Sequence, residues 1–247
     1  MAGAGHGQLR RIFMKFTLSL VALSLGLSFA SAADAHNTLT EAEKKEGWQL
    51  LFDGHSTTGW RGYRQQAMPA AGWEVKDGTF KTIPKVKGSD IIFEKKFGDF
   101  ELTWEWRIAP AGNNGIKYCV LEERPKAPGH EYQMLDDDGH PDGKIGPHRQ
   151  TASFYDVLPP AKDKKLKPVG EWNSSRILVQ GNHVEHWLNG AKVLSFDLGS
   201  DEVKAALAKS KFKSIETFGT KVEGHIMLTY HSDECWFRDL KIRVPKQ

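Results

Sequence analysis

Short apolar and β-branched segments, separated by turn-forming residues, recur along almost the whole chain. Gly, Asn, Asp and Pro separate these segments, which span residues 48–52, 73–75, 79–83, 90–93, 100–108, 115–121, 131–135, 176–180, 183–188, 192–197, 225–230 and 235–244. Eleven or twelve short strands with frequent turns are typical of antiparallel sheets that pack face to face. The pattern therefore predicts an all-β sandwich, with a short helix-like lead at 40–45 and one further helix at 201–209.

The clearest turn is Leu188-Asn189-Gly190-Ala191. Asn-Gly between two alternating strands favours a type I′ hairpin, because both central residues need a positive φ. We therefore expect residues 183–188 and 192–196 to form two paired strands.

The N-terminus has the features of a signal peptide. Basic residues precede an apolar stretch at 16–30, which ends in Ala30-Ser31-Ala32. This pattern predicts export to the periplasm or beyond, cleavage after Ala32, and no membrane insertion after the signal is removed. A buried helix or a membrane anchor is the alternative interpretation.

Removal of residues 1–32 leaves roughly 215 residues, a length that suits one all-β domain. No linker or repeat divides them, so we expect an N-terminal lead at 33–45 and one domain at 46–247. The net charge of +3 and its even spread do not indicate a nucleic-acid partner. Cys119 and Cys235 allow either one disulfide or two buried thiols.

The segment 131–135 carries two polar side chains at alternate positions. Glu131 and Gln133 lie two residues apart, so in a strand both side chains point to one face. A carboxylate and an amide on one face suit sugar hydroxyls or acid–base chemistry. We interpret Glu131 as a catalytic candidate and Gln133 as a substrate-binding candidate, and a solvated edge strand is the alternative.

The segment 183–188 also alternates, with Glu185 and Trp187 on one face and His186 on the other. An aromatic ring can stack on a sugar while a neighbouring carboxylate accepts its hydroxyl bonds. We therefore expect Glu185 and Trp187 to bind substrate on the same concave face as Glu131 and Gln133. His186 is a third catalytic candidate, with a core histidine as the alternative interpretation.

The long irregular stretch at 136–167 has few apolar residues and many ionisable ones, which is typical of a functional loop. His140 is a catalytic candidate there, and Arg149 and Tyr155 are substrate-binding candidates. Asp136 and Asp138 are candidate ligands for a divalent cation, which could polarise a ketone. An Asx-rich turn explains the same carboxylates without a metal, so no cofactor is assigned.

Six motifs stand in a characteristic order along the mature chain. They are Leu51-Phe52-Asp53-Gly54 with Gly59-Trp60, Gly112-Asn113-Asn114-Gly115-Ile116, Glu131-Tyr132-Gln133-Met134-Leu135-Asp136-Asp137, Gly170-Glu171-Trp172-Asn173, the run from Gly181 to Gly190, and Trp236-Phe237-Arg238-Asp239-Leu240-Lys241-Ile242. Together they resemble the 3-keto-disaccharide hydrolase domain family, formerly a domain of unknown function, over residues 46–244.

The resemblance implies a concanavalin A-like jelly roll of two curved antiparallel sheets, with the sugar site on the concave sheet. It also implies substrate contacts for Asn173 and His231. One departure concerns Thr229-Tyr230-His231, where the family often has Gln-Asp-His. A role for His231 that needs an adjacent carboxylate is therefore not expected.

The function that the resemblance implies is the cleavage of 3-keto-glycosides. A ketone at the third sugar carbon acidifies the proton on the second carbon, so a base can form an enolate that expels the anomeric leaving group. Such a site needs a base, an electrophile for the enolate oxygen and an acid. A carbohydrate-binding module and a conventional β-glycosidase are the alternatives, although a retaining glycosidase would need a second carboxylate about 5 Å away.

Overall fold

The computed structural model describes residues 1–5, 35–124 and 129–245. The chain divides into two units, residues 1–34 and 35–247, and the second contains all the secondary structure described below. Apart from its first five residues, the predicted signal peptide lies outside the described residues. No helix among the described residues is long and apolar enough to cross a membrane.

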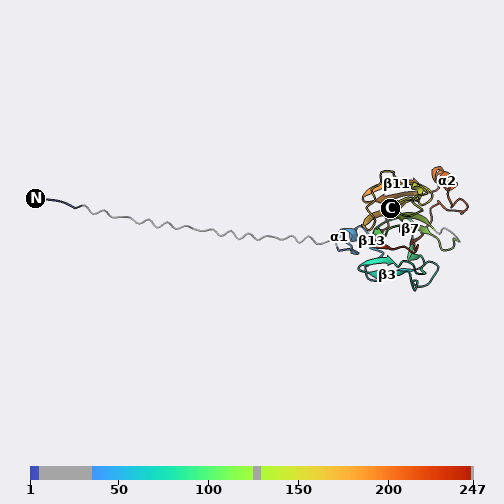
Figure 1. Cartoon of the computed structure of the whole chain (residues 1–247), viewed down its shortest axis with the longest axis horizontal. Coiled ribbons are helices and arrows are strands. Elements are labelled where there is room, and N and C mark those ends of the chain that lie inside the picture. Colours follow the sequence, from blue (N-terminus) through green and yellow to red (C-terminus); the bar gives the residue numbers. More distant parts are fainter. Residues whose placement is uncertain (6–34, 125–128, 246–247) are drawn as a thin grey trace. The chain divides into compact units, whose positions relative to one another are not determined.

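The domain is built from two antiparallel sheets, which confirms the predicted all-β sandwich. The larger sheet has the order β11 (Ala191–Asp197), β10 (His183–Leu188), β9 (Asn173–Gln180), β6 (Phe100–Ile108), β13 (Cys235–Arg243), β4 (Thr79–Thr82) and β3 (Trp73–Lys76), and β1 (Gln49–Leu50) pairs with β13. The smaller sheet has the order β2 (Trp60–Gly62), β5 (Ile91–Phe97), β12 (Gly224–Leu228), β7 (Asn113–Val120) and β8 (His130–Leu135). Strands β3 and β11 lie at opposite ends of the larger sheet (Figure 1).

Two short helices flank the sheets, α1 (Glu41–Lys45) and α2 (Asp201–Leu207). Both begin at a hydroxyl N-cap, because the side chains of Thr40 and Ser200 accept hydrogen bonds from backbone N–H groups of the first turn. A single 3-10 turn, Pro147–Arg149, lies in the long loop between β8 and β9.

The sheets pack through aromatic side chains that point inward from both. Trp104 of β6 lies edge-on to Tyr132 of β8, with ring centroids 4.9 Å apart, and its Nε1–H contacts the sulfur of Met134 at 3.3 Å. Because Tyr132 and Met134 occupy the core, their neighbours Glu131 and Gln133 point to the outer face of the smaller sheet.

The predicted hairpin is present. Asn189 and Gly190 both have positive φ, 48° and 82°, and they join the antiparallel strands β10 and β11. Between His186 and Trp187 the register shifts by a bulge. The short strand β2 was not predicted, because it offers only three residues, Trp60–Gly62.

Strand β8 forms one edge of the smaller sheet, and the loop that follows it turns back along this edge. Ala152 N–H donates to Gln133 C=O at 2.9 Å, and Tyr155 N–H donates to Glu131 C=O at 3.0 Å. Phe154 forms an isolated bridge with Tyr132. Residues 152–155 therefore cover the outer edge of the strand that carries Glu131.

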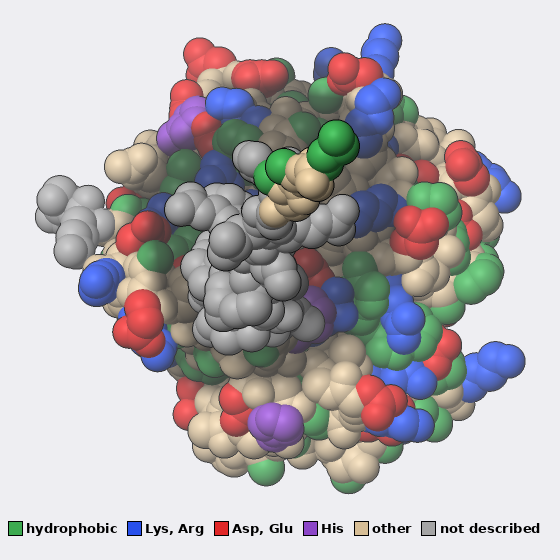
Figure 2. Space-filling view, turned by 90° about the vertical axis from the view of Figure 1, so that its left-hand side faces the viewer, with side chains coloured by type: hydrophobic (Ala, Val, Ile, Leu, Met, Phe, Trp, Pro, Cys, Tyr) green, Lys and Arg blue, Asp and Glu red, His purple; other side chains and the backbone are tan. Residues whose placement is uncertain are grey.

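Cys119 and Cys235 are free thiols, both fully buried. Burial raises the pKa of Cys119 to about 11 and that of Cys235 well above its usual value. Of the two alternatives for these cysteines, the structure therefore has the buried thiols. At the surface, acidic and basic side chains are interspersed on the face shown in Figure 2.

Candidate active site

A cavity of about 240 Å³ lies over the outer face of the smaller sheet. Its lining combines polar side chains of β7 and β8 with residues from four loops: Asn113, Lys117, Gly129, Glu131, Gln133, Tyr155, Lys211, Phe212 and His231. Four of the residues predicted from the sequence, Glu131, Gln133, Tyr155 and His231, therefore meet in one place.

Strand β8 supplies the most enclosed polar side chains of the cavity. Glu131 is 7% exposed and Gln133 is 1% exposed. The amide oxygens of Gln133 and of Asn113 are buried and accept no hydrogen bond within the described residues. Buried acceptors without a donor are costly in a folded protein, so these two amides favour a ligand that brings hydroxyl donors.

Gly115 of β7 leaves the space in which the Glu131 side chain lies. A Cβ at Gly115 would stand 2.4 Å from Glu131 Oε1, closer than real Cβ contacts, and 3.0 Å from its Cγ. One pleat further along β7, Lys117 lies opposite Glu131, with Nζ 3.7 Å from its Oε2. Glu131 is thus held between a glycine and an ammonium group.

Tyr155 and Lys211 form the opposite wall. Tyr155 is 9% exposed, and its hydroxyl donates to Asp142 Oδ2 at 2.6 Å while accepting from Lys211 Nζ at 2.9 Å. Burial and the neighbouring Asp142 carboxylate raise the pKa of Tyr155. Burial of the ammonium end lowers the pKa of Lys211, although the residue as a whole is exposed.

Arg149 lies behind this wall and holds two carboxylates. Its Nη1 donates to Asp142 Oδ1 at 2.8 Å, and its Nε donates to Asp156 Oδ1 at 2.5 Å. Burial opposes ionisation of Asp142, but hydrogen bonds from Tyr155 and Arg149 outweigh it and lower the pKa of this carboxyl. Asp142 is therefore an ionised acceptor for Tyr155, and Arg149, predicted to bind substrate, lies outside the cavity lining.

His186 does not reach the cavity, which corrects its prediction as a catalytic residue. It is fully buried in the core, where Nδ1 contacts Ala152 C=O at 3.0 Å and Nε2 contacts the Tyr118 hydroxyl at 3.0 Å. Burial lowers the pKa of His186 to about 4. With both nitrogens engaged and no access to ligand, His186 is the core histidine of the alternative interpretation.

Glu185 and Trp187 lie on the opposite side of the molecule from Glu131, so the prediction of one shared concave face is wrong. They belong to β10 of the larger sheet, whose Val184, His186 and Leu188 fill the core. Trp187 Nε1 donates to Glu185 Oε2 at 2.7 Å, and the Arg176 guanidinium stacks on the Trp187 ring at 4.0 Å. This ring therefore already has a cationic partner in the protein.

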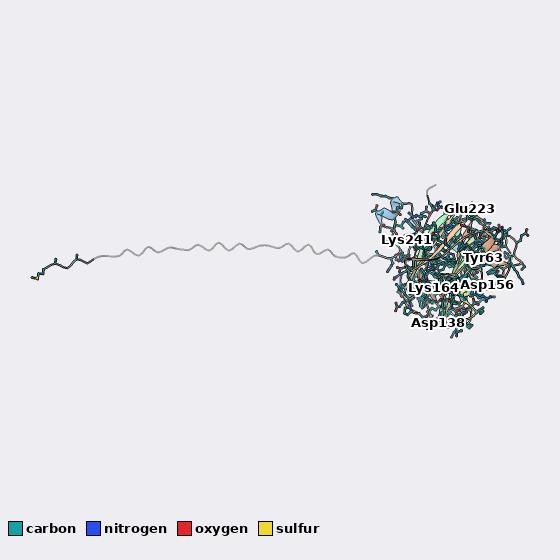
Figure 3. All side chains as sticks on the ribbon, turned by 90° about the horizontal axis from the view of Figure 1, so that it is seen from above. Tyr63, Asp138, Asp156, Lys164, Glu223 and Lys241 are labelled. Atoms are coloured by element: carbon teal, nitrogen blue, oxygen red, sulfur yellow. The ribbon has the colours of Figure 1, made fainter. Side chains whose placement is uncertain are left out.

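The predicted cation ligands do not converge. Asp136 accepts hydrogen bonds from the N–H groups of Gly139 and Ala111, at 2.9 and 2.7 Å, as in an Asx turn. Asp138 is exposed and lies at the periphery, whereas Asp156 lies further in (Figure 3). Within the described part of the chain, the side chains spaced to share a metal ion are instead His36, Glu105 and Asp239.

Two further candidates lie outside the cavity. His140 Nδ1 accepts the N–H of Asp142 at 3.1 Å, so this imidazole shapes the loop that carries Asp142. Asn173 lines a separate cavity of about 380 Å³, together with Trp106, Leu135 and residues 166–171. Its Oδ1 accepts bonds from Lys167 N–H at 3.0 Å and Asn189 Nδ2 at 2.8 Å. Neither residue lines the Glu131 cavity.

Five of the nine lining residues were not among the predicted site residues: Asn113, Lys117, Gly129, Lys211 and Phe212. Lys117 could have been found from the strand pattern, because it alternates with Gly115 on the segment next to Glu131. Lys211 and Phe212 follow α2 in an irregular segment, and no periodicity in the sequence marks them. Phe212 stacks on Phe218, with ring centroids 4.5 Å apart, and so adds an apolar surface to the cavity.

Within the described residues, the cavity therefore combines one carboxylate, two lysine ammonium groups and an imidazole with a tyrosine hydroxyl, a phenylalanine ring and two amide oxygens that accept no hydrogen bond. A model of the 3-keto-alpha-glucoside-1,2-lyase-like domain matches residues 47–243. A 3-keto-disaccharide hydrolase of Bacteroides thetaiotaomicron is 35% identical over 232 residues, which cover 81% of this chain and 79% of that protein.

Two crystal structures of Parabacteroides distasonis proteins, both provisionally assigned as glycosyl hydrolases, share the fold. One is 35% identical with a TM-score of 0.77, covering 86% of this chain and all of that one. The other is 27% identical with a TM-score of 0.60, covering 79% and 98%. The match over most of the domain shows that this chain belongs to the 3-keto-alpha-glucoside-1,2-lyase-like domain family.

Proposed function

We propose that this protein is a carbohydrate-active enzyme that cleaves glycosides whose third carbon has been oxidised to a ketone, and that it acts outside the cytoplasm. Family membership and the name of the Bacteroides relative support the substrate class. The charged and apolar N-terminal segment supports export.

The observation that carries the proposal is the combination of charges in the cavity. Glu131 is the one carboxylate among the described residues that line it, and two lysines accompany it. Retaining and inverting glycosidases need two carboxyl groups that flank the scissile bond. One carboxylate with amines suits the abstraction of a proton next to a ketone, because the amines can stabilise the negative charge that develops.

Glu131 is the proposed base. Its carboxylate would remove the proton on the second carbon, and the electron pair of that C–H bond would form an enolate with the ketone. When the carbonyl re-forms, the bond between the first carbon and the glycosidic oxygen breaks, and this oxygen takes a proton. His231, which lies exposed at the cavity, is available to supply that proton.

The size and lining of the cavity favour a single sugar ring. Its volume of about 240 Å³ is below the ~300–1,000 Å³ of pockets for drug-sized ligands. The amide oxygens of Gln133 and Asn113, which accept no hydrogen bond within the described residues, would accept hydrogen bonds from sugar hydroxyls, and the Phe212 ring would contact the apolar face of the sugar. The rest of the glycoside would extend out of the cavity.

The test compares a 3-keto-glucoside with its unoxidised parent, with products followed by mass. Wild-type protein should release the leaving group from the keto substrate alone, and Glu131→Gln should lower kcat by roughly 10²–10⁴, the range for loss of a general base. Glu185→Gln, a matched change on the other sheet, should retain activity. Equal cleavage of both glycosides, or full activity of Glu131→Gln, would refute the proposal.

A further inference from the structure

Lys211 is held at both ends by the cavity wall, although it comes from an irregular segment after α2. Its backbone N–H donates to Asp156 Oδ2 at 2.7 Å, and its Nζ donates to the Tyr155 hydroxyl at 2.9 Å. The ammonium group also lies 4.1 Å from the centroid of the Tyr155 ring. Two hydrogen bonds and a cation–π contact thus fix a side chain that would otherwise be free at the surface.

These anchors belong to a closed ring of contacts. Asp156 is bound by Arg149, Arg149 also binds Asp142, Asp142 accepts from Tyr155, and Tyr155 accepts from Lys211. Arg149 is thus the member that ties both carboxylates together. The ring fixes the direction of Lys211 Nζ without using up its donors.

The hydrogen-bond donors of Tyr155, Lys117 and Lys211 differ in whether they are already engaged within the protein. The single hydroxyl proton of Tyr155 is given to Asp142, so Tyr155 has none left for a ligand. Lys117 Nζ lies 3.7 Å from Glu131, the proposed base. An ammonium group has three N–H donors, and among the described residues Lys211 Nζ donates only to Tyr155. Two donors of Lys211 therefore remain for a ligand in the cavity.

We propose that Lys211 is a catalytic residue that donates a hydrogen bond from Nζ to the ketone oxygen of the substrate and stabilises the enolate. Arg149, Asp142 and Tyr155 are positioning residues that hold Nζ in place. This inference rests on the proposed function. When the base takes the proton from the second carbon, the C–H electron pair forms a double bond to the third carbon. The carbonyl π pair then moves onto the oxygen that faces Lys211, and no oxidant or further reactant is needed.

A substrate analogue without a leaving group isolates this step. In a 3-keto-1,5-anhydrohexitol, hydrogen replaces the glycosidic oxygen, so the enolate can form but there is no glycosidic leaving group to expel. Exchange of the proton on the second carbon for deuterium, followed by NMR in D₂O, then measures enolate formation alone. Wild-type protein should catalyse this exchange at the second carbon.

Lys211→Met should slow the exchange at least tenfold. Loss of one donor at a developing oxyanion costs roughly 10²–10³ in enclosed sites, and the exposure of Lys211 reduces the expected effect. Lys211→Arg, which keeps the positive charge, should retain more exchange than Lys211→Met. Lys209→Met, an exposed lysine on the same segment that does not line the cavity, should behave as wild type.

The outcomes separate this inference from the proposed function. Undiminished exchange by Lys211→Met, or equal loss in the Arg and Met variants, would overturn the role of Lys211 while leaving the cleavage of 3-keto-glycosides intact. If the wild type cleaves the 3-keto-glycoside but does not exchange the proton of the analogue, the role of Lys211 in stabilising an enolate would also be overturned. If exchange depends on Lys211 but the protein cleaves no 3-keto-glycoside, the role of Lys211 would be supported and the proposed function refuted.

Discussion

Gly115 illustrates how much of the site depends on single residues. A Cβ on Gly115 would stand only 2.4 Å from Glu131 Oε1, so the carboxylate can keep its position only because residue 115 is glycine. The same residue anchors β7 to the segment after β12, since its C=O accepts from Thr229 N–H at 3.1 Å. Toward Glu131, its role is to leave space rather than to provide a contact.

We predict that Gly115→Ala lowers activity by about 100-fold, because a displacement of ~1 Å at a catalytic group can cost that much. The measurement is kcat/KM on the keto substrate, with the melting temperature recorded in parallel. Gly98→Ala is the matched control, because no atom lies within 4 Å of the Cβ it would add. An active Gly115→Ala protein would show that Glu131 has room to move, or that its position is unimportant.

The residues that could be predicted from sequence are those whose direction is fixed by strand alternation. Glu131 and Gln133 lie on one face of β8, as their spacing indicates. The same alternation placed His186 on the apolar side of its strand, and the structure has it in the core. Lys211 could not be found in this way, because its position depends on tertiary contacts with Tyr155 and Asp156.

At the scale of the elements, two buried imidazoles join strands of different sheets. His130 of β8 and His186 of β10 both pack edge-on to Tyr118, with centroid distances of 5.5 and 5.8 Å. Burial lowers the pKa of His130 to about 3, with further contributions from Arg124 and His186, and burial lowers that of His186 to about 4. Both rings are therefore neutral in the folded domain.

This neutrality predicts a loss of stability in acid. In the unfolded chain, His130 and His186 take up a proton near pH 6.5. In the folded chain, His186 takes up a proton only at about pH 4. Stability is therefore complete above pH 6.5 and falls as the pH drops from 6.5 towards 4. Urea unfolding across this range should show a decrease of a few kcal/mol, and His186→Gln should be less stable at pH 7 but less sensitive to pH. A slope unchanged in the variant would contradict this account.

Strands and fold class could be predicted from the sequence, but apart from the hairpin of β10 and β11 the partners of each strand could not. Family motifs and periodicity indicate a sandwich of antiparallel sheets, which the structure confirms. Alternation predicts which residues share a face of one strand. It does not predict whether β8 and β10 belong to the same sheet. Pairing between distant segments decides that question, and it separates Glu131 from Glu185.

For the whole molecule, the N-terminal segment leads to a prediction about location. Basic residues, an apolar stretch and Ala30-Ser31-Ala32 together predict export with cleavage after Ala32. N-terminal sequencing of the protein recovered outside the cytoplasm should begin at Ala33. Replacement of the small residues Ala30 and Ala32 by bulky ones should block processing. A recovered protein that retains residues 16–30 would contradict the prediction.

The loop that turns back along β8 has a consequence beyond catalysis. A bare edge strand offers unpaired N–H and C=O groups that can recruit strands of other molecules and start aggregation. Residues 152–155 form hydrogen bonds with the backbone of Glu131 and Gln133. The segment that supplies Tyr155 to the cavity therefore also covers this edge of the sheet. Relatives that shorten this loop would have to protect the edge by other means. Changes in this loop that adapt the cavity to a new substrate must therefore also keep the edge of β8 covered, so that the protein stays soluble.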